Sequence, residues 1–168
     1  MSRESTACSA GPLEMLQACH GRIEEQLEAL EKLAQRPPAS AAAAKAVLDY
    51  FNTSGALHHQ DEDQDLFPLL RRRAGALGRS EVAAAIEELE REHATMEAQW
   101  RRLRGQLNAL AEGGEEPALD AEEVTRFAWL YRRHMDRESA LVLPFAKDVL
   151  GEEERAELGA RMAARRSA

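Results

Sequence analysis

The stretch HHQDEDQDLFP from His58 to Pro68 decides the fold, and the stretch HMDRESALVLP from His134 to Pro144 repeats its pattern. Each has a glutamate four residues after the first histidine and a proline ten residues after it. Residues four apart lie on one face of an α-helix, so each histidine and its glutamate should project from the same side. A single histidine precedes each copy, His20 by 38 residues and His93 by 41. The chain therefore resolves into two helix-pair halves related by a pseudo-twofold axis.

Outward from these stretches, the composition favours helices. Ala, Leu, Glu, Arg and Gln dominate and β-branched residues are scarce. Ser40, Ser80 and Asp120 are suitable N-caps, residues 75–80 should form a turn, and Pro144 should kink or end the last long helix. We expect long helices over about 12–36, 40–73 and 81–112 and from about 121, and a short polar helix over about 152–165.

These elements predict an all-α protein, an up-down-up-down four-helix bundle with a short C-terminal helix. The expected organisation is a flexible N-terminal tail (1–11), the bundle (12–150), and a short C-terminal helix and tail (151–168). The basic end of the chain, from Arg161, looks mobile and gives no specific partner signal.

Composition and charge narrow the classes of function. The 168 residues, 44% of them hydrophobic, suffice for one domain with one core. A net charge of −8 disfavours nucleic acid, and the basic runs at 71–73 and 101–102 are flanked by acidic residues. No apolar run approaches the roughly 20 residues of a membrane span. Without a secretory signal or a disulfide framework, a cytoplasmic location is expected.

Each of the four long helices carries one histidine on its apolar seam, where an apolar residue would otherwise stand. Two seams add a glutamate one turn later. Counted from the loops at about 1.5 Å per residue, these side chains lie at similar heights near the middle of the bundle. Met96 and Trp100 flank one histidine as apolar walls. The six seam residues are His20, His58, Glu62, His93, His134 and Glu138.

Four imidazoles and two carboxylates in a dry core need a positive charge among them, because unpaired buried carboxylates are costly. One tetrahedral zinc would use four ligands, whereas two ions bridged by carboxylates would use all six and keep positions open. The sequence therefore predicts a dinuclear metal site. A mononuclear site and a metal-free structural bundle are the alternatives.

These motifs resemble the hemerythrin-like, or HHE cation-binding, family over about residues 12–150. The resemblance implies a four-helix bundle that holds two non-haem iron ions with an oxo or hydroxo bridge, with manganese or zinc as other possible metals. It also implies a role for each of the six residues. His20 and His58 would be terminal ligands of one iron, and His93 and His134 of the other. Glu62 and Glu138 would bridge the two irons.

The chain departs from the oxygen-carrying members at Glu97, where they place a further histidine. Glu97 is either an anionic terminal ligand or a sign that one iron keeps an open site. His59 and Tyr131 are further candidates for a ligand or a hydrogen-bond partner of a ligand. His59 lies about 100° around the helix from His58, so a partly exposed surface position is the alternative. For Tyr131 the alternative is a core aromatic.

The resemblance implies two alternative functions. The first is a protein that binds or senses oxygen, nitric oxide or iron. The second is a redox enzyme, or an iron donor in iron-sulfur repair, which uses the same site. A carboxylate-rich site favours redox chemistry, sensing or iron handling over reversible oxygen carriage. The expected partner is a small diatomic ligand or peroxide. No catalytic residue is assigned, and the sequence does not identify a protein partner.

Overall fold

The computed structural model describes residues 10–36, 40–114 and 119–168, and within these ranges it is all-α. The expected N-terminal tail lies, up to residue 9, outside the described residues. The elements, with η for a π-helical segment, are α1 (Pro12–Gln35), α2 (Ala41–Asn52), α3 (Ser54–Gln60), η1 (Asp61–Leu66), α4 (Phe67–Ala76), α5 (Ser80–Ala111), α6 (Ala121–Arg137), η2 (Glu138–Val142), α7 (Leu143–Val149) and α8 (Glu152–Ser167).

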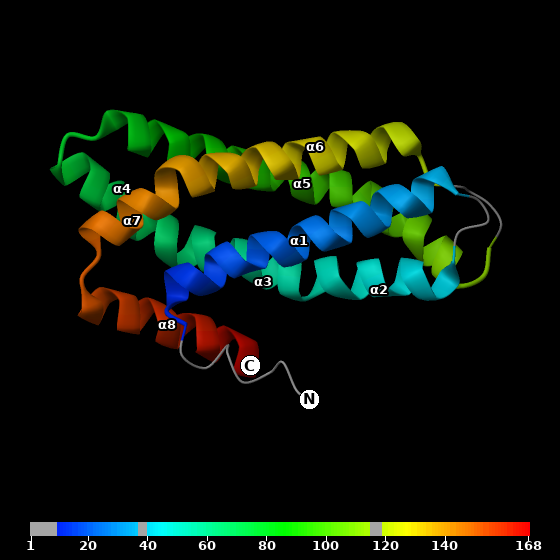
Figure 1. Cartoon of the computed structure of the whole chain (residues 1–168), viewed down its shortest axis with the longest axis horizontal. Helices are drawn as coiled ribbons and strands as arrows, with labels where there is room; N and C mark the ends of the chain where they lie inside the picture. The colour runs from blue at the N-terminus through cyan, green and yellow to red at the C-terminus, as the bar shows by residue number, and fades with distance from the viewer. Residues whose placement is uncertain (1–9, 37–39, 115–118) are drawn as a thin grey trace.

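Four long rods form an antiparallel bundle, as the sequence predicts (Figure 1). The segments α2, α3, η1 and α4 follow one another as the second rod, and α6, η2 and α7 make the fourth. The rod α1 packs against α2 and α6, and α5 packs against α2, α4 and α6. None of the helices in the described ranges combines the length and the apolar character needed to cross a bilayer.

Of the three predicted N-caps, two are confirmed and one is wrong. Ser40 accepts the N–H of Ala43, and Asp120 accepts the N–H groups of Glu122 and Glu123. Ser80 is not a cap but the first residue of α5. The reason is the preceding turn, where Gly78 has φ +66° and the N–H of Arg79 bonds to the carbonyl of Ala74 at 2.8 Å, so the helix resumes immediately.

The second rod differs from the single helix expected over 40–73. It breaks at Thr53, whose φ and ψ are −119° and −85°, and it continues to Ala76, so that Gly75 lies inside a helix. The rod keeps its direction across this break, and the next helix, α3, begins one residue after Thr53 (Figure 1).

Neither proline of the repeated motif ends its rod. Pro68 and Pro144 each lie in the first turn of the helix that follows a π-helical segment. A proline has no N–H, and its ring conflicts with the carbonyl four residues back. Directly before each proline, the backbone bonds five residues back instead, from Phe67 to Glu62 and from Leu143 to Glu138. The wider turn therefore admits the proline without ending the rod, so of the two effects expected of Pro144, a kink or an end, the end does not occur.

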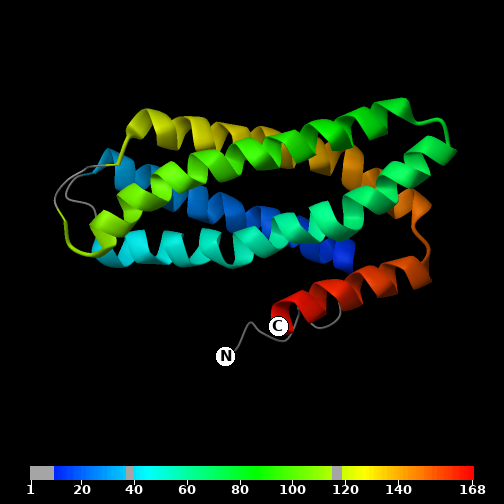
Figure 2. The same cartoon turned by 180° about the vertical axis from the view of Figure 1, so that it is seen from behind.

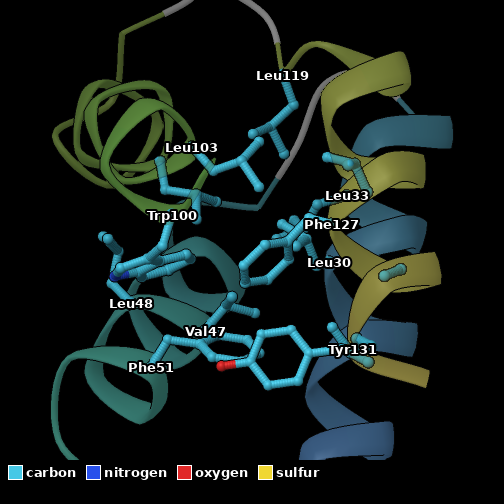
Figure 3. Close-up of a cluster of buried hydrophobic side chains, with 14 of the residues drawn as sticks. Leu30, Leu33, Val47, Leu48, Phe51, Trp100, Leu103, Leu119, Phe127 and Tyr131 are labelled. Atoms are coloured by element: carbon cyan, nitrogen blue, oxygen red, sulfur yellow. The ribbon is translucent and has the colours of Figure 1, made fainter. Parts of the chain in front are cut away.

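Two apolar clusters fill the bundle on either side of its middle. One lies toward the ends of α1 and α5, where Phe51, Phe127 and Tyr131 face one another (Figure 3). The other lies among α4, α7 and α8 and includes Leu16 and Phe67. Along each rod, apolar residues of both clusters flank the polar residues of the seam. A polar layer therefore crosses the bundle between two dry cores.

The C-terminal helix α8 runs along the outside of the bundle beside the start of α1 (Figure 2). Its Leu158 and Met162 are buried, and Gly159 lies against Pro12. The expectation of a mobile basic end from Arg161 is wrong, because α8 continues to Ser167 and is held by this packing.

Candidate metal centre

The structure brings the six seam residues together in the polar layer between the two apolar clusters. They project from all four rods, and their side chains are almost completely enclosed, with exposures of 2–7%. The π-helical segments matter here, because Glu62 lies in η1 and Glu138 begins η2. Each motif thus presents its histidine from a regular α-helix and its glutamate from a π turn, a feature frequent at functional sites.

The donor atoms form two groups. In the first, atoms of Glu62, His93, His134 and Glu138 all lie within 4.8 Å of one another. In the second, the same limit holds for His20, His58 and Glu138. Glu138 therefore belongs to both groups.

Both carboxylates face histidines of both halves. Glu138 places Oε2 2.8 Å from Nε2 of His20 and Oε1 2.6 Å from Nε2 of His134. Glu62 places Oε1 2.8 Å from Nε2 of His58 and 3.9 Å from Nε2 of His93. This geometry suits two carboxylates that span a pair of cations.

All four imidazoles face the centre with Nε2, and three of them meet a polar side chain at Nδ1. Nδ1 of His20 lies 3.2 Å from Oγ of Ser139, and Nδ1 of His93 lies 2.8 Å from Oδ1 of Asp63. Nδ1 of His134 is 2.9 Å from Oε2 of Glu92. A hydrogen bond at Nδ1 fixes the ring and leaves Nε2 to a metal, which is the usual arrangement of metal-binding histidines.

The carboxylates supply a second indication of a cation. Oε1 of Glu62 and Oε1 of Glu138 are buried, and neither makes a hydrogen bond of good geometry with the imidazole beside it. Burial and the neighbouring Glu138 raise the pKa of Glu62. For Glu138, burial also raises the pKa, but His134 and the hydrogen bonds around it prevail and lower it. These donors fit divalent or trivalent cations, which would pair both oxygens and relieve the cost of burial that raises the pKa of Glu62.

The imidazole of His134 binds its proton more tightly than an ordinary histidine does. Burial lowers its pKa, but Glu138 and Glu92 outweigh that effect and raise it to about 10. The metal-free centre is therefore a hydrogen-bonded set of carboxylates around a protonated imidazole. Metal binding to such a set exchanges protons for cations.

His59 and Tyr131 lie beside the two ligand groups and belong to neither. The half-buried His59 ring stacks on His93 with 4.0 Å between centroids and on Tyr131 with 5.4 Å. Enclosure and the nearby His93 lower the pKa of His59, so its ring is neutral at pH 7. Tyr131 is 4% exposed, and burial raises its pKa, so it stays a phenol. Both residues form a wall of the centre.

Glu97 is not brought to the centre. Its side chain is 66% exposed, and an Oε1 atom lies 2.8 Å from a guanidinium nitrogen of Arg101. Among the described residues, the third rod therefore contributes one side chain, His93, to the first ligand group. A pair of octahedral ions held by these six protein side chains would keep coordination positions free for other ligands.

A groove of about 480 Å³ leads from the surface to this wall. Phe51, Met96 and Trp100 form its apolar side, and His59, His93 and Tyr131 lie at its inner end. Glu97 and Arg104 are among its polar lining residues.

Sequence reasoning missed the residues that orient the ring nitrogens, which are Ser139, Asp63 and Glu92. All three are sequence neighbours of seam residues, which is a weak signal. Each, however, contacts a histidine of another rod. The seam pattern does not give the rotation of one helix relative to its neighbour, on which these contacts depend.

An antiparallel four-helix bundle with imidazoles and carboxylates from all rods in its core defines the class of helical metal-binding bundles. Comparison with known proteins gives the family. The sequence profile described as the Hemerythrin HHE cation binding domain matches residues 11–146. The chain therefore belongs to the hemerythrin HHE cation-binding family.

A relative covers nearly the whole chain. It is an uncharacterized protein of Haemophilus influenzae (strain ATCC 51907 / DSM 11121 / KW20 / Rd), 31% identical over 161 residues, which are 92% of this chain and 90% of the relative. Family membership and the buried His/Glu cluster together indicate cation binding.

Proposed function

We propose that the chain holds two iron ions at the metal centre and uses them to bind or sense a small ligand, such as oxygen, nitric oxide, peroxide or iron itself. The observation that carries the proposal is the sharing of Glu138 between two groups of buried donors. A single ion cannot be reached by both groups at normal bond lengths, whereas two ions spanned by carboxylates use every donor. In this assignment His20 and His58 hold one ion, and His93 and His134 hold the other.

The free positions and the groove support the binding of an added ligand. Glu97 is turned to Arg101, so the ion beside His93 has fewer protein ligands than in oxygen-carrying members. The groove ends at this same histidine, beside the ring of His59. When bound, iron would supply the redox and ligand-binding chemistry. The protein would supply bridging carboxylates, fixed imidazoles, and apolar walls that limit water.

A redox enzyme or an iron donor is the second candidate, and the size of the groove favours it. A volume of about 480 Å³ exceeds what a diatomic ligand needs and would admit a small organic reductant or chelating group. In either case a cytoplasmic location stays a prediction.

Iron content tests the metal assignment. We expect two irons per chain in the wild type and a loss of at least one iron in Glu62→Ala and in Glu138→Ala. Glu97→Ala, which removes an exposed carboxylate of the neighbouring rod, should keep both. Retention of two irons by both bridge variants would contradict the assignment, and loss of iron from Glu97→Ala would make Glu97 a ligand.

The optical spectrum of the ferrous protein separates the two functions. The chain is loaded with ferrous iron without oxygen, and air is then admitted. A spectral change that reverses when oxygen is removed would support binding or sensing. Irreversible oxidation, followed by consumption of many equivalents of peroxide when a reductant is present, would support the enzyme.

A further inference from the structure

A salt-bridge cluster outside the metal centre joins α8 to η1. Its central residue is Asp61, whose charged side chain is 0% exposed. Arg165 donates from Nη1 to Oδ1 of Asp61 at 2.5 Å, and Arg166 donates from Nη2 to Oδ2 at 2.7 Å. Two guanidinium groups thus satisfy both oxygens of one buried carboxylate. Such pairing is the condition under which a buried charge is tolerated.

The cluster extends along α8. Arg165 also donates to Oδ2 of Asp65 at 2.6 Å and to Oε1 of Gln64 at 3.2 Å. At its outer edge, Arg161 lies 3.4 Å from Oδ1 of Asp65 and is 63% exposed. The apolar residues of α8, Leu158 and Met162, pack on the bundle. This packing holds the arginines of the same helix against η1.

Asp61 immediately precedes Glu62 and lies in the same π turn, Asp61–Leu66. That turn is held at its far end by the bond from Phe67 N–H to the carbonyl of Glu62. Because the two residues share a peptide link, the anchoring of the Asp61 side chain restricts the backbone from which Glu62 projects.

The second half of the chain anchors the equivalent position with the opposite charge. Arg137 immediately precedes Glu138, and its Nη1 lies 2.9 Å from Oε2 of Glu88 and 3.5 Å from Oε1 of Glu92. Both of these glutamates belong to α5, which is itself one of the four rods of the bundle. The first half instead takes its anchor from α8, a helix added outside the four rods.

We propose that α8 is a positioning clamp for the metal centre, in which Arg165 and Arg166 hold Asp61 and so fix the π turn that carries Glu62. The inference rests on the proposed metal-binding function. None of these three residues belongs to a ligand group. Without the arginines, Asp61 is an unpaired buried charge, and the turn relieves this cost by opening toward water. Glu62 then moves away from the histidines it faces.

The test uses the full chain loaded with Co²⁺, whose visible absorption reports its ligand geometry. Arg165→Gln/Arg166→Gln is compared with the wild type and with Arg161→Gln, which removes a peripheral arginine of the same helix. Release of Co²⁺ to a chelator is followed at a temperature where circular dichroism shows every variant folded. We expect about tenfold faster release and a shifted spectrum for the double variant. Arg161→Gln should stay within twofold of the wild type.

Two further variants distinguish positioning from general stability. Arg165→Lys/Arg166→Lys keeps both charges and should recover most of the slow release. Asp61→Asn, which keeps the shape of the side chain, should speed release by itself but should not speed it further in the double glutamine variant, because the two changes break the same contact and the asparagine leaves no unpaired charge. If the two arginines only stabilised the fold, the double glutamine variant would have a lower urea midpoint as the metal-free chain, but its Co²⁺ spectrum and Co²⁺ release rate would match the wild type.

The outcomes separate this inference from the proposed function. Wild-type release rates in the double glutamine variant would overturn the clamp while the metal centre stands. Fully additive effects of Asp61→Asn, or a lysine variant that releases metal as fast as the glutamine variant, would do the same. A wild-type chain that binds no metal would overturn the proposed function, and the clamp with it.

Discussion

His134 and Glu92 are joined on the side of the imidazole that faces away from the metal centre, with 2.9 Å between Nδ1 and Oε2. Glu92 comes from α5 and also pairs with the guanidinium of Arg133. Burial raises the pKa of Glu92, but His134 and Arg133 lower it below its usual value, so the side chain is an acceptor at neutral pH. It therefore fixes the proton on Nδ1 and directs Nε2 to the centre.

Substitution of Glu92 should weaken metal binding without removing a ligand. We expect Glu92→Gln to lower metal affinity about 10- to 100-fold, the range found for partners of metal-binding histidines. The matched control is Glu87→Gln, five residues earlier on α5, whose side chain is 66% exposed and pairs with Arg91. Competition with a chromogenic chelator measures both affinities. Equal affinities for the two variants would show that Glu92 does not support the centre.

Filling the groove should slow access to the centre. Ala94 lines the groove, whereas Ala98, one turn further along α5, does not, and both positions are exposed. We expect Ala94→Trp to slow the binding of azide to the metal-loaded chain at least fivefold, and Ala98→Trp to leave the rate unchanged. Stopped-flow absorption measures both rates. If azide binds Ala94→Trp as fast as Ala98→Trp, ligands reach the centre by another path.

Removal of the metal should lower the melting temperature. An ion that binds only the folded chain stabilises it by about 2.7 kcal/mol at a free concentration 100 times its dissociation constant. Without the ion, the unpartnered oxygens of Glu62 and Glu138 stay buried at a cost. Calorimetry of the loaded and the chelated chain measures the difference. Identical melting curves would favour the metal-free structural bundle.

The sequence predicted the rods and the residues of the seam because both depend on local spacing. Histidines spaced 38, 35 and 41 residues apart, each on a four-three apolar pattern, leave the chain few ways to bury those patterns in one core. Asp61 shows the limit of this reasoning. Nothing near it in sequence predicts its burial, because the neutralising Arg165 and Arg166 lie more than 100 residues away.

An ion-pair cluster between α1 and α6 should make the stability of the metal-free chain depend on pH. Arg132 contacts Glu24 at 2.7 Å and Glu31 at 2.8 Å. The hydrogen bond from Arg132 lowers the pKa of Glu31 from its ordinary value of 4.5, against the opposing effect of burial. Because the folded-state pKa is the lower one, the stabilisation is fully present above pH 4.5 and is lost as the pH falls through the folded value.

Arg132→Gln should therefore destabilise the metal-free chain by at most about 1 kcal/mol near pH 7, because the cluster is partly exposed. The difference from the wild type should shrink below pH 4.5 as Glu31 takes up a proton in both proteins. Urea denaturation at several pH values measures it. Arg126→Gln, which breaks an exposed pair with Glu122 on the same helix, should cost less at every pH. A destabilisation by Arg132→Gln that grows on acidification would contradict the assignment of the pH dependence to Glu31, because protonation of that carboxyl can only weaken the pair.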